Sequence, residues 1–262
     1  DDFSGANFIL VKNTLRALQD LSAAHRKKFD FPVIGITGSN GKTIVKEWLF
    51  QLLQKKFRIV RSPKSYNSQV GVPLSVWQME ESNSLGIFEA GISFPDEMDR
   101  LQSIIRPNIG IFTNLGEAHS ENFISSIQKA GEKLKLFTKV DTLVYCADHM
   151  AIQEVIIRSQ ILETVSAFTW SRKQDADLRI TDVQRTGPAT SLIKGIYTGK
   201  EMEIEIPFTD EASIENAIHC WATLLHLNQE PGMIAEGMKK LQPIAMRMEM
   251  KAGINHCMII ND

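Results

Sequence analysis

The segment from Val33 to Thr43 combines residue types that can hold a polyphosphate. The apolar strand pattern Val33–Thr37 runs into a glycine-rich turn that ends in Gly-Lys-Thr, and a helical pattern follows at once. Glycines let a backbone take positive φ angles and approach oxygen atoms closely, and the N–H groups at a helix N-terminus attract anions. The turn is therefore predicted to bind phosphate through Gly38, Ser39, Asn40, Gly41, Lys42 and Thr43.

Two residues of this turn add specific chemistry. Lys42 supplies a full positive charge to the phosphates, and the Thr43 hydroxyl is placed to ligate Mg²⁺. A full P-loop has a glycine where Ile36 stands, so this is the shorter form Gly-x-x-Gly-Lys-Thr. The alternative is a chance Gly-Lys-Thr in a surface turn, and the strand before it and the helix after it favour the P-loop.

Polar residues also follow two later strand patterns. The strand Leu85–Ala90 carries Glu89 at its end, and the strand Ile109–Thr113 leads through a short loop to His119. Because the carboxyl ends of parallel strands meet at one edge of a sheet, both side chains are expected near Lys42. A carboxylate beside a P-loop threonine is typical of a second magnesium ligand. The simpler alternatives are a surface glutamate and a histidine satisfied within its own loop.

The elements that would position these residues alternate between strand and helix. This order predicts an α/β fold with a mainly parallel P-loop sheet and helices on both faces. The expected strands are Val33–Thr37, Arg58–Arg61, Leu85–Ala90, Ile109–Thr113 and Thr142–Cys146. The expected helices are Ala6–Lys28, Thr43–Lys56, Pro73–Met79, Pro95–Ile105 and Ile124–Phe137.

The pattern changes to period two between Ala176 and Pro207, which predicts a smaller antiparallel segment. Its strands are expected at 178–180, 192–197 and 202–206, with turns at Thr186-Gly-Pro188 and Thr198-Gly199. Helices are predicted over 214–227 and 231–241, and a final strand over 253–260. With no obvious flexible linker, this second part is expected to pack on the same sheet.

Composition excludes several classes of partner. The net charge of −2 gives no reason to expect nucleic acid. No apolar run approaches the roughly 20 residues of a membrane-spanning helix, so no membrane insertion is expected. Three widely spaced cysteines are typical of free thiols in a reducing compartment, which indicates a cytoplasmic protein.

Several motifs, in order, resemble the ATP-binding central domain of the Mur ligases. Within that family they are most similar to the member that adds D-Ala-D-Ala. The P-loop continues into Val45-Lys-Glu47, as in that member. The other matching segments are Asn67-Ser-Gln-Val-Gly-Val-Pro73, Phe88-Glu-Ala-Gly91, Asn114-Leu-Gly-Glu-Ala-His119, Glu132-Lys-Leu-Lys-Leu-Phe137, Asn216-Ala and Arg247-Met-Glu249.

The resemblance implies a site with ATP and two Mg²⁺ ions. Thr43 and Glu89 would hold one ion. His119 and Lys133 would serve the second, with Lys133 carbamylated by CO₂ so that it presents oxygen atoms. Lys135 is the local competitor for that role, and the offset from Phe137 favours Lys133.

The resemblance also implies contacts to the rest of the ligands. Asn216 would hydrogen-bond adenine, Arg247 would contact ribose or phosphate, and Asn67 would line the substrate channel. Two departures weaken this transfer. Ala212-Ser213 stand where relatives often have His-Asn, and Ser68-Gln69 stand where relatives often have Asn-Asp or Asn-Glu.

The implied reaction is ATP-dependent amide formation in peptidoglycan precursor synthesis, joining UDP-MurNAc-tripeptide and D-Ala-D-Ala through an acyl phosphate. By the same resemblance, residues 1–30 would be a connecting helix from a missing N-terminal domain, 31–252 the central domain, and 253–262 the start of a missing C-terminal domain. Such a fragment is expected to be inactive alone. The alternatives are a sister Mur ligase of an earlier step, a folylpolyglutamate synthetase, a P-loop kinase and an isolated nucleotide-binding module.

Overall fold

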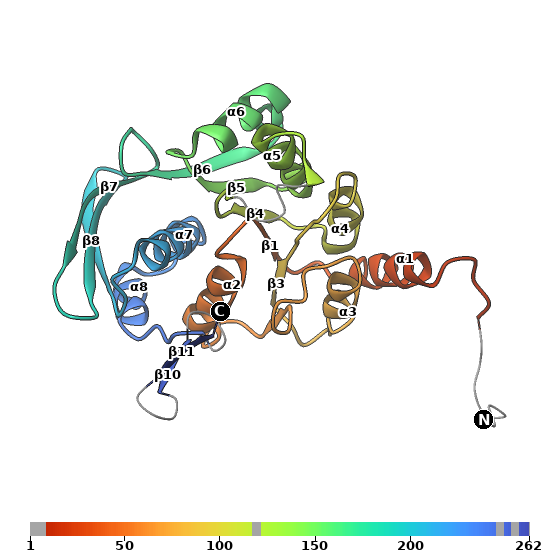
Figure 1. Cartoon of the computed structure of the whole chain (residues 1–262), viewed down its shortest axis with the longest axis horizontal. Coiled ribbons are helices and arrows are strands. Elements are labelled where there is room, and N and C mark those ends of the chain that lie inside the picture. The colour runs from red at the N-terminus through yellow and green to blue at the C-terminus, as the bar shows by residue number, and fades with distance from the viewer. Residues whose placement is uncertain (1–8, 117–121, 245–248, 253–256, 262) are drawn as a thin grey trace.

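A single nine-stranded sheet carries the P-loop strand as the third strand from one edge (Figure 1). The computed structural model describes residues 9–116, 122–244, 249–252 and 257–261. The strand order is β2-β3-β1-β4-β5-β6-β7-β8-β9. The strands are β1 (Val33–Thr37), β2 (Ile59–Arg61), β3 (Leu85–Glu89), β4 (Ile109–Phe112), β5 (Thr142–Cys146), β6 (Ser166–Ser171), β7 (Leu178–Arg185), β8 (Ser191–Tyr197) and β9 (Lys200–Ile206).

Pairing is parallel from β2 through to β7, and β7, β8 and β9 pair antiparallel. The chain leaving β1 goes to β2 on one side, and the chain leaving β3 crosses β1 to reach β4 on the other. The carboxyl end of β1 is therefore a topological switch point, where sheets of this kind bind their ligands.

Helices cover both faces of the sheet, and the strand residues alternate between two buried clusters. The first cluster contains Ile34 and Ile36 of β1 together with α2, α7 and α8, and the second contains Val33 together with α4, α5 and α6. Figure 1 shows the sheet curving around α2, α7 and α8. The helices are α1 (Thr14–Arg26), α2 (Lys42–Leu53), α3 (Gly71–Val76), α4 (Met98–Ile105), α5 (Ser126–Leu134), α6 (Met150–Ser159), α7 (Glu211–His226) and α8 (Pro231–Met238).

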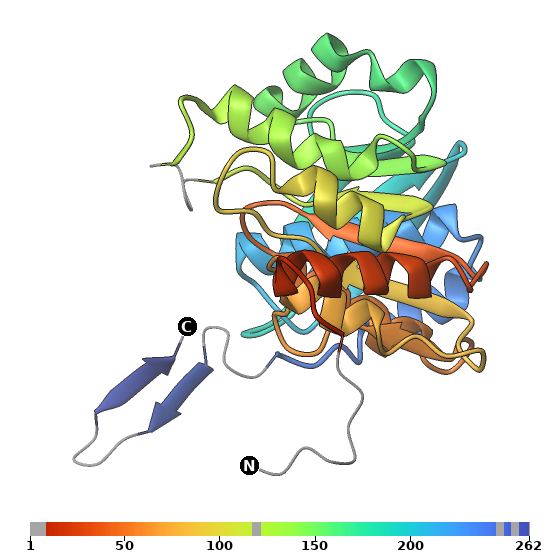
Figure 2. The same cartoon turned by 90° about the vertical axis from the view of Figure 1, so that its right-hand side faces the viewer.

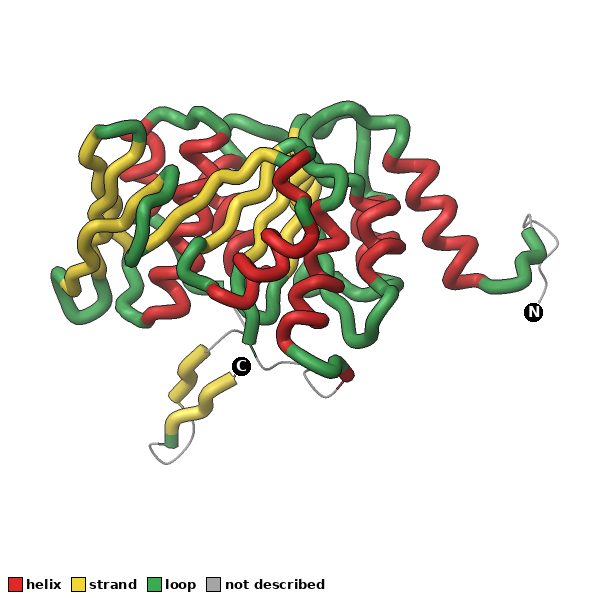
Figure 3. Tube along the Cα trace, turned by 90° about the horizontal axis from the view of Figure 1, so that it is seen from above, coloured by secondary structure: helices red, strands yellow, loops and turns green. Residues whose placement is uncertain are grey.

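The antiparallel part extends the same sheet, as the sequence predicts. The β8–β9 turn is formed by Thr198 and Gly199, with φ angles of 49° and 76°, a pair of values typical of a tight hairpin turn. These strands lie at the opposite end of the molecule from α1 (Figure 3). A separate two-stranded antiparallel sheet is formed by β10 (Glu249–Ala252) and β11 (Met258–Asn261) (Figure 2).

Several predicted boundaries are wrong. The first helix begins at Thr14 rather than Ala6, because the Asn13 side chain accepts a hydrogen bond from the Arg16 N–H (2.8 Å) and caps it. The helix predicted from Pro95 begins at Met98, because Glu97 Oε2 accepts the N–H groups of Ser93 and Phe94 and holds a turn there.

Other elements were missed or merged. Helix α6, the short 3-10 helix η3 (Ile161–Glu163) and strand β6 fall in a stretch that the sequence analysis left unassigned. The predicted helix 124–137 is α5 followed by the 3-10 helix η2 (Lys135–Phe137). In place of one final strand over 253–260, β10 and β11 are present, and residues 253–256 lie outside the described part. Within the described residues, no helix has the length and apolar character needed to cross a membrane.

Close packing of β4 against η2 generates a stability prediction. A Cβ added to Gly110 would lie 2.3 Å from Cδ1 of Phe137. Overpacking of this kind costs roughly 1–3 kcal/mol. Gly110→Ala should therefore lower the free energy of unfolding by about that amount, measured by chemical denaturation.

Gly232 in α8 provides the matched control, because a Cβ there meets no heavy atom within 4 Å. Gly232→Ala should leave stability unchanged or raise it slightly, since alanine favours helix. Equal stability of the Gly110 variant and the wild type would contradict this account of the β4–η2 packing.

Candidate functional site

The P-loop is enclosed between the end of β4 and helix α7, which leave no room for a side chain at either of its two glycines. A Cβ on Gly38 would lie 2.0 Å from Oγ1 of Thr113, and a Cβ on Gly41 would lie 2.2 Å from Oδ1 of Asn216. Gly41 also has a φ of 81° and forms the N-cap of α2. The loop is anchored on Asn114, whose backbone carbonyl accepts the Ser39 N–H and whose Oδ1 accepts the Asn40 N–H, both at 2.9 Å.

Lysine ammonium groups converge on this loop. Lys42 Nζ donates to the carbonyl oxygens of Gly38 (2.9 Å) and Ser39 (3.2 Å), and Lys133 Nζ donates to the same Gly38 oxygen at 3.1 Å. Lys129 Nζ donates to the Gly116 carbonyl at 2.6 Å. This concentration of positive charge at the N-terminus of α2 suits an anion such as phosphate.

Lys133 is buried and its ionisation is perturbed. Burial, followed by the charges of Lys42 and Lys129, lowers the pKa of Lys133 to about 7. A large fraction of this amine is therefore uncharged near pH 7, and the uncharged form can act as a nucleophile. Lys135, the competing residue, lies at the surface among Asp96, Asp99 and Glu132, and these carboxylates raise its pKa.

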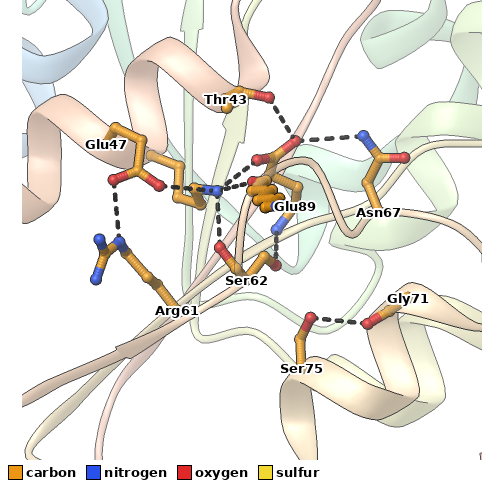
Figure 4. A network of polar contacts seen from close by, with 10 residues as sticks. Thr43, Glu47, Arg61, Ser62, Asn67, Gly71, Ser75 and Glu89 are labelled. Carbon is orange, nitrogen blue, oxygen red and sulfur yellow. Dashed lines mark hydrogen bonds and ion pairs between the residues drawn. The ribbon is translucent and has the colours of Figure 1, made fainter. Parts of the chain in front are cut away.

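The carboxylate of Glu89 lies beside the Thr43 hydroxyl (Figure 4). Thr43 Oγ1 donates to Glu89 Oε2 at 3.1 Å, and Asn67 Nδ2 donates to the same oxygen at 3.3 Å. The octahedral oxygens around Mg²⁺ lie about 3 Å apart, given Mg–O distances of about 2.0–2.1 Å. The Thr43 and Glu89 oxygens could thus be adjacent ligands of one ion, and this donor set fits magnesium.

Sequence reasoning gave no role to Lys46, which is fully buried against Glu89. Its Nζ lies 2.9 Å from Glu89 Oε1 and 3.1 Å from Glu47 Oε1. The available signal was its spacing: residues three apart on a helix lie on one side, so Lys46 follows Thr43 along the side of α2 that faces β3.

A cleft of about 350 Å³ opens between the P-loop and the loops that follow β2 and β3. Asn67 lies in it, packed against Gly91, where an added Cβ would be 2.9 Å from Asn67 Oδ1. Lys42, Lys133 and the P-loop thus form one wall of a space large enough for part of a second substrate. The cleft is lined by Gly38, Ser39, Lys42, Asn67, Ser68, Gln69, Val70, Gly91, Ile92, Ser93, Phe94, Glu97 and Lys133.

The opposite flank of the P-loop is formed by α7 and the loop after β5. Asn216 is buried there against Gly41. Oε1 of its neighbour Glu215 lies 2.9 Å from Nε2 of His149. His219 is buried, with its Nε2 2.8 Å from the Thr113 carbonyl oxygen, and burial lowers its pKa to about 4. His219 is therefore a neutral histidine that joins α7 to β4.

Two predicted site residues, His119 and Arg247, lie outside the described residues. Among the described residues, no group of three or more His, Cys, Asp or Glu side chains could hold a metal ion. Within the described residues, the oxygens placed to bind one Mg²⁺ are those of Thr43 and Glu89. The remaining coordination positions would be filled by phosphate and water, because Mg²⁺ usually keeps several of its waters.

A mostly parallel sheet in which an inner strand runs through a Gly-Lys-Thr loop into a helix defines the P-loop class of proteins. The family model for the Mur ligase middle domain matches residues 36–224. The chain therefore belongs to the Mur ligase family. It is 30% identical, over 97% of its length, to the UDP-N-acetylmuramoyl-tripeptide--D-alanyl-D-alanine ligase of Bacillus subtilis, of which the match covers 54%.

Solved structures show the same fold. The crystal structure of MurF from Acinetobacter baumannii superposes with a TM-score of 0.86 at 21% identity, covering 97% of this chain and 55% of that one. MurF ligase from Thermotoga maritima in complex with ADP gives a TM-score of 0.82 at 18% identity, covering 100% of this chain and 60% of that one. The chain thus spans about half the length of the curated relative named above.

The buried position of Lys133 predicts a pH dependence of stability. Its pKa is about 7 in the folded chain against a usual value of 10.5, so the unfolded chain binds more protons between these values. Stability contributed by Lys133 therefore rises with pH across this window. In bicarbonate-free buffer, Lys133→Met should be more stable than the wild type at about pH 6, and the difference should shrink towards about pH 10.

Lys135→Met is the control with the opposite sign, because carboxylates raise the pKa of Lys135 and its charge is favourable in the folded state. That variant should be slightly less stable than the wild type throughout this pH range. A constant difference between Lys133→Met and the wild type at all pH values would show that Lys133 titrates normally.

Proposed function

We propose that this chain supplies the ATP and magnesium site of a ligase that joins D-Ala-D-Ala to UDP-MurNAc-tripeptide in peptidoglycan precursor synthesis. The observation that carries the proposal is the convergence of Lys42 and Lys133 on the Gly38 carbonyl at one wall of the cleft, with Glu89 and Thr43 beside them. The name of the Bacillus subtilis relative supports the choice of substrates.

The proposed domain organisation follows from the same relatives. Residues 1–30 would connect to an N-terminal domain, residues 31–252 would be the central domain, and residues 253–262 would begin a C-terminal domain. Holding reactants in line can account for roughly 7–11 kcal/mol of barrier reduction. The 262-residue chain is therefore proposed to bind nucleotide but to ligate little without the rest of the protein. The thiols Cys146 and Cys220 are buried and unpaired, which supports a cytoplasmic location.

In the proposed reaction, a substrate carboxylate attacks the γ-phosphorus of ATP, the bond to the β–γ bridging oxygen breaks, and ADP leaves, which gives an acyl phosphate. The amine of D-Ala-D-Ala then displaces phosphate and forms the amide. Bound Mg²⁺ would offset the negative charge of the transferring group. Lys42 and the loop amides hold the β- and γ-phosphates, and Asn67 orients the acceptor at the cleft. Asn216 is proposed to contact adenine, and Arg247 ribose or phosphate.

Lys133 is proposed to act as a carbamate. Its neutral amine attacks the carbon of CO₂, a C–N bond forms, and the nitrogen loses a proton, which leaves a carboxylate-like anion. Together with His119, that anion would serve a second Mg²⁺. Its lowered pKa supports this step, since only the neutral amine is nucleophilic. The anion would also relieve the accumulation of positive charge beside Lys42 and Lys129.

Other ligases and kinases fit less well. The relative's name favours the D-Ala-D-Ala-adding enzyme over a ligase of an earlier step or a folylpolyglutamate synthetase. An isolated nucleotide-binding module would leave the cleft beside Asn67 without a role. The match to the Mur ligase middle domain favours a ligase over a P-loop kinase.

The nucleotide site is tested by Lys42→Ala. Loss of a charge-assisted contact to phosphate should weaken binding of Mg·ATP by roughly 1.5–3 kcal/mol. Isothermal titration calorimetry on the 262-residue chain measures the difference. The control is Lys28→Ala, which removes an exposed lysine two residues beyond the end of α1 and should not change the affinity for Mg·ATP. Equal affinity of the Lys42 variant and the wild type would remove Lys42 from the site.

The role of Lys133 is tested in the longer protein that carries all domains. Lys133→Ala should abolish most ligation without unfolding the protein. High bicarbonate should not restore activity, whereas a short carboxylic acid should restore part of it by placing an oxygen ligand in the vacated space. Lys135→Ala should be nearly silent, because that side chain points about 200° further round the helix. The reverse pattern would overturn the assignment of Lys133.

A further inference from the structure

Lys46 is a wholly buried ammonium surrounded by four oxygen atoms. Its Nζ donates to the carbonyl oxygens of Ser62 (2.7 Å) and Lys64, and it lies within 3.1 Å of one carboxylate oxygen of Glu47 and of Glu89. Figure 4 shows Glu89, Glu47 and Ser62 grouped around this point, with Arg61 beyond Glu47. Glu47 has Arg61 as a second cationic partner, at 3.1 Å. Among the described residues, Lys46 is the cation that forms an ion pair with Glu89.

The two oxygens of Glu89 face different surroundings as a result. Oε1 faces the ammonium of Lys46 at 2.9 Å in the interior, and Oε2 faces Thr43 and Asn67 at the cleft. The backbone of Glu89 is fixed as well, because its N–H donates to Ser62 Oγ at 3.1 Å. The carboxylate therefore cannot turn both oxygens towards the cleft without breaking the Lys46 ion pair.

We propose that Lys46 is a positioning residue that sets the metal selectivity of the site. By occupying Oε1, it makes Glu89 present a single oxygen to the bound cation and so favours Mg²⁺ over Ca²⁺. This inference rests on the proposed nucleotide and magnesium site.

The chemistry of the two ions supports this direction. Mg²⁺ requires octahedral geometry at about 2.0–2.1 Å and takes carboxylates through one oxygen, whereas Ca²⁺ accepts 6–8 oxygens at about 2.3–2.6 Å, often from a bidentate carboxylate. A Glu89 released from Lys46 could offer both oxygens, which suits Ca²⁺. An effect of charge alone has a different signature, since loss of one positive charge nearby would strengthen the binding of both ions alike.

Lys46 also couples the cation site to the acceptor side of the cleft. The carbonyls that it binds, at Ser62 and Lys64, begin the segment that leads to Asn67, and Asn67 donates to the other oxygen of Glu89. One side chain on α2 thus fixes the carboxylate on β3 and the loop that carries Asn67. The same arrangement explains why a cation is needed at this depth: two carboxylates and two carbonyl oxygens converge there.

The test compares the affinity of AMP-PNP, a non-hydrolysable ATP analogue, in Mg²⁺, in Ca²⁺ and in EDTA. In the wild-type chain, Mg²⁺ should increase affinity more than Ca²⁺ does. In Lys46→Met, the increase due to Mg²⁺ should fall about 10–100-fold, the range typical of losing a group that orients a metal ligand. The increase due to Ca²⁺ should fall less or rise, and the affinity in EDTA should not change.

Controls separate the inference from loss of structure. Lys55→Met removes an exposed lysine just beyond the end of α2 and should behave as the wild type does. Thermal unfolding verifies that each variant is folded, and Lys46→Gln, which keeps a polar group in the buried position, is used if Lys46→Met does not fold. An unchanged preference for Mg²⁺ over Ca²⁺ would overturn the proposal, as would an equal loss of affinity in all three conditions or an equal gain with both ions. Failure of the wild type to bind AMP-PNP would instead overturn the proposed function and this inference with it.

Discussion

The carbonyl oxygen of Gly38 accepts hydrogen bonds from two lysines, and the rest of the site depends on that accumulation of charge. Lys42 and Lys133 share this oxygen, and Lys129 is close enough to lower the pKa of Lys133 further. Two ammonium groups on one neutral acceptor repel each other in a poorly solvated site. The repulsion is relieved when one amine is neutral or when an anion such as phosphate enters.

The fold creates this convergence through the direction of its strands. Because β1, β3 and β4 are parallel, Gly38, Glu89 and Thr113 all arrive at one edge of the sheet. The P-loop then has so little room between β4 and α7 that side chains are excluded at Gly38 and Gly41. Helix α2 begins at the end of that loop and carries Thr43 and Lys46 to opposite oxygens of the Glu89 carboxylate. The parallel topology thus brings these strand ends close together, and α2 places the Thr43 hydroxyl and the Lys46 ammonium beside the Glu89 carboxylate.

Local pattern was enough to predict the parallel sheet, the P-loop and the approach of Glu89 to Thr43, because these depend on strand direction and on turn chemistry. The resemblance to the Mur ligases, through the offset from Phe137, favoured Lys133 over Lys135. The structure places Lys133 at the P-loop and Lys135 among surface carboxylates. Lys46 was missed because a lysine next to a glutamate on a helix usually faces solvent, although its spacing from Thr43 puts it on the side of α2 that faces β3. Strand β6 was missed although Phe168 and Trp170, buried on either side of the half-buried Thr169, show the two-residue period of a strand. The signal is short, because the first two residues of β6 are exposed.

A buried ion pair such as Lys46–Glu89 is weak evidence for a contribution to stability. Desolvation of both charges offsets most of their attraction, and apolar residues of similar volume often stabilise a core as well or better. Stability alone therefore gives no reason to place a lysine here. The orientation of Glu89 does, because only a group bound to Oε1 leaves Oε2 as the single oxygen at the cleft. The free energy spent on burying Lys46 is then best understood as fixing the geometry of a carboxylate that has to meet a cation with strict coordination.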